Sequence, residues 1–260
     1  MDGVRGVLID IDGVLTQSWR PIDGAVDALS WLRECDLPVK LLTNTTSKSR
    51  QWMAQTLADA GFDVRVDDIV TAPSATAAYL TEHHPGARCL LLNSGDIGED
   101  LDDITLVEDE PDVVVFGGAG PEFSYDALNR AFGFVQQGAA LIAMQRNLFW
   151  RTDSGLQLDT GAFLLGLERA AHVDADVVGK PAASFFTSAL ATLGVDASDA
   201  VMVGDDIESD VLAAQAVGIT GVLVKTGKYL PETHRDAGGT PDHVIDSIAE
   251  IRSLVSAESA

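Results

Sequence analysis

Short apolar runs that favour β-strands alternate along the chain with segments of helical periodicity, and this alternation limits the possible folds most. Residues 4–9 form one such run, and residues 38–42 form a second. Between them, residues 24–35 carry apolar side chains at helical spacing, and Ser47 is a candidate N-cap for a later helix that ends near Ala60. This order of strands and helices predicts right-handed βαβ units and a parallel sheet.

The same alternation returns near the C-terminus. Strands are predicted at residues 200–203 and 221–224, and helices at residues 207–217 and 246–255. The motif Gly179-Lys180-Pro181 precedes another helix, whose first helical residue would be the proline. These segments predict a second part of the same sheet.

A long segment between the two halves has strand and helix candidates of its own. Its predicted strands and helices lie at residues 87–92, 113–116, 125–137, 140–144 and 163–171. We therefore predict a doubly wound parallel-sheet (Rossmann-like) α/β core with an inserted second α/β domain. The expected division is residues 1–75 for the first core part, 76–177 for the insert and 178–260 for the second core part.

Acidic side chains far outnumber basic ones. The chain has 40 Asp and Glu residues against 17 Lys and Arg residues, a formal net charge of -23 at pH 7. A nucleic-acid backbone or an anionic membrane surface would be repelled, so we expect no nucleic-acid partner and no membrane partner. A small anionic substrate stays compatible with this charge if the site carries its own cations.

The two cysteines, Cys35 and Cys89, occur without a CxxC motif and without a histidine at zinc spacing. We expect them to be buried apolar residues rather than a disulfide or a metal site. The first apolar run is too short for a signal peptide, and no run is long enough to span a membrane. These features predict a cytoplasmic protein.

Polar groups suited to phosphate chemistry follow the predicted strands. Four signals occur in chain order: Asp10-Ile11-Asp12-Gly13, Thr43-Asn44, Lys180, and Gly204-Asp205-Asp206 with Asp210. Open α/β sheets bind ligands at the carboxyl ends of their strands. We therefore expect these side chains to form one site.

Each signal taken alone also has a purely structural explanation. Asp-x-Asp-Gly occurs in solvated turns, and Gly204-Asp205-Asp206 can be a turn followed by an N-cap. The first signal also resembles the start of a calcium-binding EF-hand loop, but Val14 and Pro21 stand where that loop needs oxygen ligands. The order of all four signals favours a shared site over coincidence.

In this order and context, the motifs resemble those of the haloacid-dehalogenase-like phosphohydrolases. The family's four motifs are matched by Asp10/Asp12, Thr43, Lys180 and Asp205/Asp206/Asp210. The position of the insert is similar to that of the large α/β cap in the nagD-like class. Val178-Gly179-Lys180-Pro181 and the run from Val224 to Tyr229 resemble the phospholysine/phosphohistidine/inorganic pyrophosphate phosphatase branch.

The resemblance implies a role for the residues of the first three motifs. Asp10 would attack phosphorus and form an aspartyl phosphate, and Asp12 would act as general acid and then as general base. Thr43, Asn44 and Lys180 would bind the phosphoryl oxygens and stabilise the charge that develops on them.

The resemblance also implies a Mg²⁺ cofactor, because several carboxylates and a phosphate dianion repel one another without a divalent cation. By family position, the metal ligands would be Asp10, the backbone carbonyl of Asp12, and Asp205. Asp206 and Asp210 would act mainly by orienting these ligands rather than by binding the metal themselves.

Within the insert, residues 145–151 align with a segment that faces the active site in this family. This implies substrate contacts from Arg146, Asn147 and Arg151, although an ordinary strand with two core aromatics is an equal alternative. Capped relatives commonly dimerise through this domain, so we expect a homodimer.

These inferences predict a Mg²⁺-dependent phosphatase of small phosphorylated metabolites. A signalling receiver also combines an acceptor Asp with further acids, a Thr and a Lys, but it lacks the second acid at Asp12 and the insert. A non-catalytic paralogue that binds phosphorylated ligands is the other alternative, and it would usually have lost one of the four motifs.

Overall fold

The computed structural model describes residues 3–152 and 155–255, and for residues 150–152 it describes the backbone only. The chain divides into two compact units. We call the first the core unit, which comprises Met1–Thr43, Gln51–Val70 and Lys180–Ala260. The second is the inserted unit, which comprises Asn44–Arg50 and Thr71–Gly179 and so starts earlier in the chain than residue 76.

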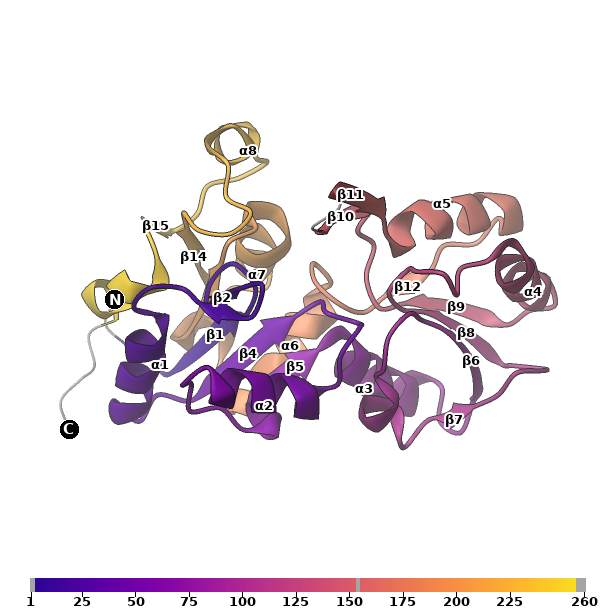
Figure 1. Ribbon diagram of the computed structural model, residues 1–260, viewed down its shortest axis with the longest axis horizontal. Coiled ribbons are helices and arrows are strands. Elements are labelled where there is room, and N and C mark those ends of the chain that lie inside the picture. Colours follow the sequence, from indigo (N-terminus) through magenta and orange to yellow (C-terminus); the bar gives the residue numbers. More distant parts are fainter. Residues whose placement is uncertain (1–2, 153–154, 256–260) are drawn as a thin grey trace. The chain divides into compact units, whose positions relative to one another are not determined.

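A six-stranded sheet in the order β15-β14-β13-β1-β4-β5 forms the centre of the core unit (Figure 1). Its strands are β1 (Gly6–Asp10), β4 (Val39–Thr43), β5 (Ile69–Thr71), β13 (Ala200–Gly204), β14 (Thr220–Val224) and β15 (His243–Ile245). β1 pairs in parallel with both β13 and β4. Every residue of β1 and β13 is buried, as expected for central parallel strands with helices on both faces.

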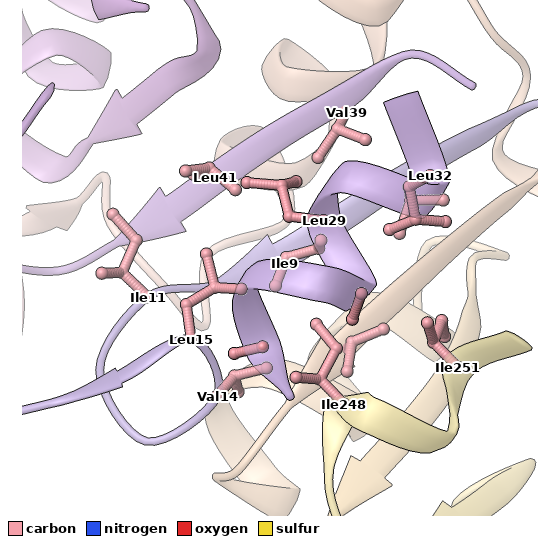
Figure 2. Close-up of a cluster of buried hydrophobic side chains, with 14 of the residues drawn as sticks. Ile9, Ile11, Val14, Leu15, Leu29, Leu32, Val39, Leu41, Ile248 and Ile251 are labelled. Atoms are coloured by element: carbon pink, nitrogen blue, oxygen red, sulfur yellow. The ribbon is translucent and has the colours of Figure 1, made fainter. Parts of the chain in front are cut away.

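All but one of the helices of the core unit bury apolar side chains, and the exception, Pro231–Asp236, has no buried residue. The helices are α1 (Ala25–Glu34), α2 (Arg50–Asp59), α6 (Ala183–Leu193), α7 (Ala213–Gln215), α8 (Pro231–Asp236) and α9 (Ile251–Leu254). The helical spacing predicted for residues 24–35 is confirmed, since Ala25, Ala28, Leu29 and Leu32 are the buried positions of α1. Figure 2 shows Leu29 and Leu32 grouped with Ile9 of β1, Leu41 of β4 and the C-terminal Ile248 and Ile251.

Several predicted helix boundaries are wrong. α2 begins at Arg50, so Ser47 is not its N-cap. α6 begins at Ala183, so Pro181, which lies in the preceding turn, is not its first helical residue. The helix predicted at residues 207–217 is a π-helical segment, Ile207–Leu212, followed by the short α7.

The inserted unit has a parallel sheet of its own, in the order β12-β9-β8-β6-β7. Its strands are β6 (Arg88–Leu92), β7 (Thr105–Leu106), β8 (Val113–Phe116), β9 (Ala140–Ala143) and β12 (Asp176–Val177). Its helices are α3 (Ala72–His83), α4 (Tyr125–Gln136) and α5 (Thr160–Ala171). A separate core around Phe116, Phe123 and Leu164 holds the unit together. The predicted class, a Rossmann-like α/β core with a second α/β domain, is confirmed.

Two short hairpins and four 3-10 turns complete the described structure. The hairpins are β2 (Thr16–Gln17) with β3 (Arg20–Pro21), and β10 (Phe149–Thr152) with β11 (Gly155–Leu158). The 3-10 turns are Val66–Asp68, Gly98–Leu101, Ala197–Asp199 and Ile248–Glu250. Among the described helices, none has both the length and the apolar composition that crossing a membrane requires.

The buried face of α1 generates a stability prediction. Leu29 is 1% exposed, so Leu29→Ala should leave a cavity in the core and lower the free energy of unfolding by about 2–5 kcal/mol. Leu230 is 51% exposed in the same unit, and Leu230→Ala is the matched control, with an expected loss of about 1 kcal/mol or less. Urea denaturation of both variants checks this, and equal losses would contradict the packing described for α1.

Candidate active site

Three carboxylates meet at the carboxyl ends of two neighbouring strands of the core unit. Asp10 is the last residue of β1, Asp205 follows β13 directly, and Asp210 lies in the π-helical segment after it. One carboxylate oxygen from each lies within 4.8 Å of the others, and all three residues are buried. We call Asp10, Asp205 and Asp210 the acid cluster.

The position of the acid cluster follows from the sheet topology. From β1 the chain continues to β4 and β5 on one side, whereas β13, β14 and β15 occupy the other side. The strand order therefore reverses between β1 and β13. In open α/β sheets a crevice forms at such a reversal, because the connections leave in opposite directions, and ligands bind there.

Lys180 provides a buried cation for the acid cluster. Its Nζ donates to Asp10 Oδ1 at 2.5 Å and to Asp210 Oδ1 at 2.7 Å. Its side chain is 5% exposed, so both ion pairs are shielded from water. Charge-assisted bonds of this kind are strong and directional, and they fix the orientation of both carboxylates.

Burial and mutual repulsion alter the protonation of the cluster. Burial is the main cause that raises the pKa of Asp10 to about 8, and Asp210 and Asp205 add to the shift while Lys180 opposes it. Burial followed by the Asp210 charge raises the pKa of Asp205 to about 7. Burial alone would lower the pKa of Lys180, but its two carboxylate partners raise it by more, so Lys180 stays protonated. Asp10 and Asp205 therefore keep their protons to a higher pH than usual unless another cation compensates the charge of the cluster.

One oxygen of Asp205 is left without a hydrogen bond. Asp205 Oδ2 accepts the backbone N–H of Lys228 at 2.6 Å, whereas the buried Oδ1 has no hydrogen-bond partner in the part of the chain that the structure describes. An unsatisfied buried carboxylate oxygen is costly, and a metal ion is one way to satisfy it. Several carboxylate oxygens around one point are the donor set that Mg²⁺ prefers. The residues present therefore fit a hard divalent cation, with Asp210 as a third candidate ligand.

Glycines allow the loops to approach the cluster closely. A Cβ atom on Gly204 would lie 2.2 Å from Asp210 Cβ, and one on Gly13 or Gly227 would lie 2.0 Å from Asp205 Oδ2. Gly13 and Gly227 also have positive φ angles of 98° and 61°. No local pattern in the sequence predicts a role for these glycines, because a close approach between distant segments leaves no local signal.

The remaining predicted residues of the core motifs differ in burial and in the unit to which they belong. Thr43 is buried at the end of β4, one residue beyond the position that pairs with Asp10. Asp12 has an exposed side chain, whose Oδ1 lies 3.4 Å from the Ser18 backbone N. Asn44 belongs to the inserted unit.

Asp206 caps the π-helical segment, as the structural explanation of Gly204-Asp205-Asp206 predicted. Its carboxylate accepts the backbone N–H groups of Glu208 and Ser209 at 3.1 and 3.0 Å. Its own N–H donates to Asp210 Oδ2 at 3.2 Å. Asp206 therefore helps to position Asp210 and offers its charge to the helix end rather than to the cluster.

The candidate substrate residues of the inserted unit are held internally where they are described. Arg146 Nη2 donates to Glu168 Oε1 of α5 at 2.5 Å, and the backbone N–H of Asn147 donates to Gln145 Oε1 at 2.5 Å. The Arg151 side chain lies outside the described residues. The alternative of an ordinary strand with core aromatics is wrong for Phe149, which is 57% exposed on β10.

Two segments of the chain match known families. Residues 7–106 match the family described as haloacid dehalogenase-like hydrolase, and residues 177–251 match the family described as HAD-hydrolase-like. Together the two segments include all of the acid cluster, and the first extends into the inserted unit.

Curated proteins align with nearly the whole chain. Phospholysine phosphohistidine inorganic pyrophosphate phosphatase from Rattus norvegicus is 37% identical over 261 residues, which cover 98% of this chain and 95% of the rat protein. The Homo sapiens protein of the same name is 38% identical over 259 residues, with 97% and 94% covered. Haloacid dehalogenase-like hydrolase domain-containing protein 2 from Homo sapiens is 38% identical over 226 residues, with 87% and 86% covered.

Solved structures share the fold over the same length. The p-nitrophenyl phosphatase from Archaeoglobus fulgidus has a TM-score of 0.91 at 29% identity, with 97% of this chain and 99% of that chain covered. NagD from E. coli K-12 has a TM-score of 0.87 at 28% identity, with 98% and 99% covered. The resemblance seen in the sequence motifs is thus confirmed, and the chain belongs to the haloacid dehalogenase-like hydrolase family, as one of its phosphatases.

Proposed function

We propose that the protein is a Mg²⁺-dependent phosphatase of small phosphorylated molecules that uses Asp10 as its nucleophile. The observation that carries this proposal is the acid cluster with Lys180 at the reversal of strand order between β1 and β13. The names of the relatives extend the candidate substrates to p-nitrophenyl phosphate, phosphoamidates and pyrophosphate.

Asp10 attacks phosphorus in the first step. The Asp10 oxygen–phosphorus bond forms while the bond to the leaving oxygen breaks, which produces an aspartyl phosphate. Attack requires the ionised carboxylate, which Lys180 favours through its charge and orients through the bond to Oδ1. Mg²⁺ bound at the acid cluster would supply the additional positive charge that three carboxylates and a phosphate require together.

Asp12 donates a proton to the leaving oxygen and then accepts one from the water that hydrolyses the aspartyl phosphate. Its exposed side chain can exchange protons with solvent between the two steps. Lys180 and the Thr43 hydroxyl stabilise the negative charge on the transferred phosphoryl oxygens. Thr43 ends β4, which pairs with β1, and Lys180 is bonded directly to Asp10.

Replacing the nucleophile tests the covalent route. Asp10→Asn should reduce turnover of p-nitrophenyl phosphate with Mg²⁺ by at least roughly 10⁴-fold, because a neutral amide cannot attack phosphorus. Asp23→Asn, at an exposed acid of the same unit, is the control that should keep full activity. Thermal unfolding should show that both variants are folded, and wild-type-like turnover by Asp10→Asn would rule out this nucleophile.

The leaving group tests the role of Asp12. Asp12→Ala should lower kcat/KM for an alkyl phosphate by about 100-fold or more, since an alkoxide leaves poorly without a proton. The loss for p-nitrophenyl phosphate should be about tenfold smaller or less, because p-nitrophenolate is a stable leaving group. Steady-state kinetics on both substrates measure this difference, and equal losses would show that Asp12 is not the general acid.

The raised pKa of Asp205 predicts how metal-free stability depends on pH. Folding raises this pKa from 3.8 to about 7, so the carboxyl stabilises the fold when it is protonated and this contribution is lost as the pH rises from about 4 to about 7. Asp205→Asn should remove that loss, which makes the metal-free variant melt at a higher temperature than the wild type at pH 8. It should also reduce the increase in melting temperature that Mg²⁺ gives the wild type.

Scanning calorimetry with EDTA or with Mg²⁺, from pH 5 to pH 8, measures both effects. Asp23→Asn should follow the wild type in both series. A variant at Asp205 that keeps the wild-type pH dependence and the wild-type response to Mg²⁺ would place the metal elsewhere.

A further inference from the structure

Lys228 is fixed beside the acid cluster by its own loop. Its backbone N–H donates to Asp205 Oδ2 at 2.6 Å, and the preceding Gly227 packs against Gly13 and Asp205. The hydroxyl of Thr226 in the same loop donates to the carbonyl oxygen of Gly13 at 2.5 Å. The loop after β14 is thus bonded to the loop after β1 and to the residue after β13. The backbone of Lys228 therefore has a defined place at the site.

The side chain of Lys228 differs from that of Lys180 in what it contacts. Lys180 is buried and bonded to two carboxylates of the acid cluster. The side chain of Lys228 is exposed, and it makes no hydrogen bond or ion pair with any other residue that the structure describes. Partial desolvation lowers the pKa of Lys228, but the charges of the acid cluster raise it by more. Lys228 is therefore a protonated amine close to the cluster, and it is open to solvent.

A small cavity lies next to this amine within the core unit. Its volume is about 60 Å³, and its polar lining comes from Asp205, Asp206, Lys228, Tyr229, Thr233 and His234. The rings of Tyr229 and His234 contact each other with their centroids 5.9 Å apart. The cavity has room for about four water-sized groups, which is comparable with a carboxylate or a phosphoryl group. Asp206 is already engaged as a helix cap, and Lys228 is the lysine that lines the cavity, so it is the candidate partner for an anion placed there.

We propose that Lys228 is a specificity-determining residue, whose ammonium group binds a second negative charge, carried by the leaving group of the substrate. The proposal rests on the phosphatase function proposed above, because it assigns the transferred phosphoryl group to Asp10 and Lys180. Substrates whose leaving group has a carboxylate or a further phosphate are then favoured over substrates with a neutral leaving group.

Because the protein and its acid cluster are negatively charged, a substrate with an anionic leaving group needs a cation at the site. The protein has a net charge of -23, and the acid cluster adds three carboxylates at the point of attack. A second negative charge on the substrate would be repelled by this field if no cation faced it. A charge-assisted hydrogen bond from Lys228 offsets that repulsion and is worth roughly 10- to 100-fold in binding.

A comparison of two substrates that differ by one negative charge tests the proposal. Phenyl phosphate and 4-carboxyphenyl phosphate share the reacting group, and only the second has an anionic leaving group. In Lys228→Met with Mg²⁺, the ratio of kcat/KM for the carboxylated over the plain substrate should fall by about 10-fold or more. Lys228→Arg should restore most of the ratio, because both side chains of this pair are cations. Both variants keep the backbone N–H that bonds to Asp205.

Lys225→Met is the matched control. Lys225 lies three residues away and pairs with Asp246 at 2.7 Å, so its loss should leave the ratio unchanged. A ratio in Lys228→Met that equals the wild-type ratio would overturn the proposal, as would an equal fall in the Lys225→Met control.

A binding measurement separates this proposal from the proposed function. Titration calorimetry of both phenyl phosphates into Asp10→Asn should show tighter binding of the carboxylated compound, and Lys228→Met in that background should abolish the difference. If the wild type hydrolyses neither compound with Mg²⁺, the phosphatase function fails for this class while calorimetry still decides the role of Lys228. Equal binding of the two compounds to Asp10→Asn would overturn the proposal for Lys228.

Discussion

Like-charge repulsion between three buried carboxylates is the constraint that organises the core unit. Asp10, Asp205 and Asp210 lie close enough to share one cation, and a single buried lysine does not balance them. Keeping such a cluster in place requires surrounding interactions that do not relax. Asp206 contributes by capping the π-helical segment and bonding to Asp210, and the loop after β14 contributes by bonding to Asp205. Backbone N–H groups thus hold the clustered carboxylates in place.

The topology makes this arrangement possible with residues that are distant in the chain. Asp10 and Lys180 are separated by 170 positions and are joined by a bond of 2.5 Å. The inserted unit takes up most of that separation, and Lys180 is the first residue after it. The residues on either side of the longer inserted segment, Val70 and Lys180, both belong to the core unit, and β13 pairs with β1 beyond it. The acid cluster of the site therefore comes from the strand order of the core unit.

The sequence was sufficient to predict the sheet-forming runs and the acids that follow them, because both have local patterns. Asp10, Lys180, Asp205 and Asp210 were named from motif order, and the structure brings them together. Helix starts were predicted poorly, since Ser47 and Pro181 are good starting residues that tertiary structure places in turns. The ion pair between Arg146 and Glu168 and the role of Gly227 depend on contacts across distant segments, for which no local pattern exists. The sequence therefore predicts the reactive side chains at the strand ends, but not the contacts between distant segments that hold them in place.

The pairing of β1 between β4 and β13 also sets an order of events on the ribosome. β4 follows β1 within a few tens of residues, but β13 begins only at Ala200. Until that strand emerges, one edge of β1 has no neighbour, and Asp10 lacks Asp205 and Asp210 of its cluster. The segment Thr71–Gly179, by contrast, already contains a complete sheet and its own apolar core, so it can fold while the remainder is still being made. A nascent chain therefore carries a folded insert before it has any means of attacking a phosphate, and activity begins only with the last third of synthesis.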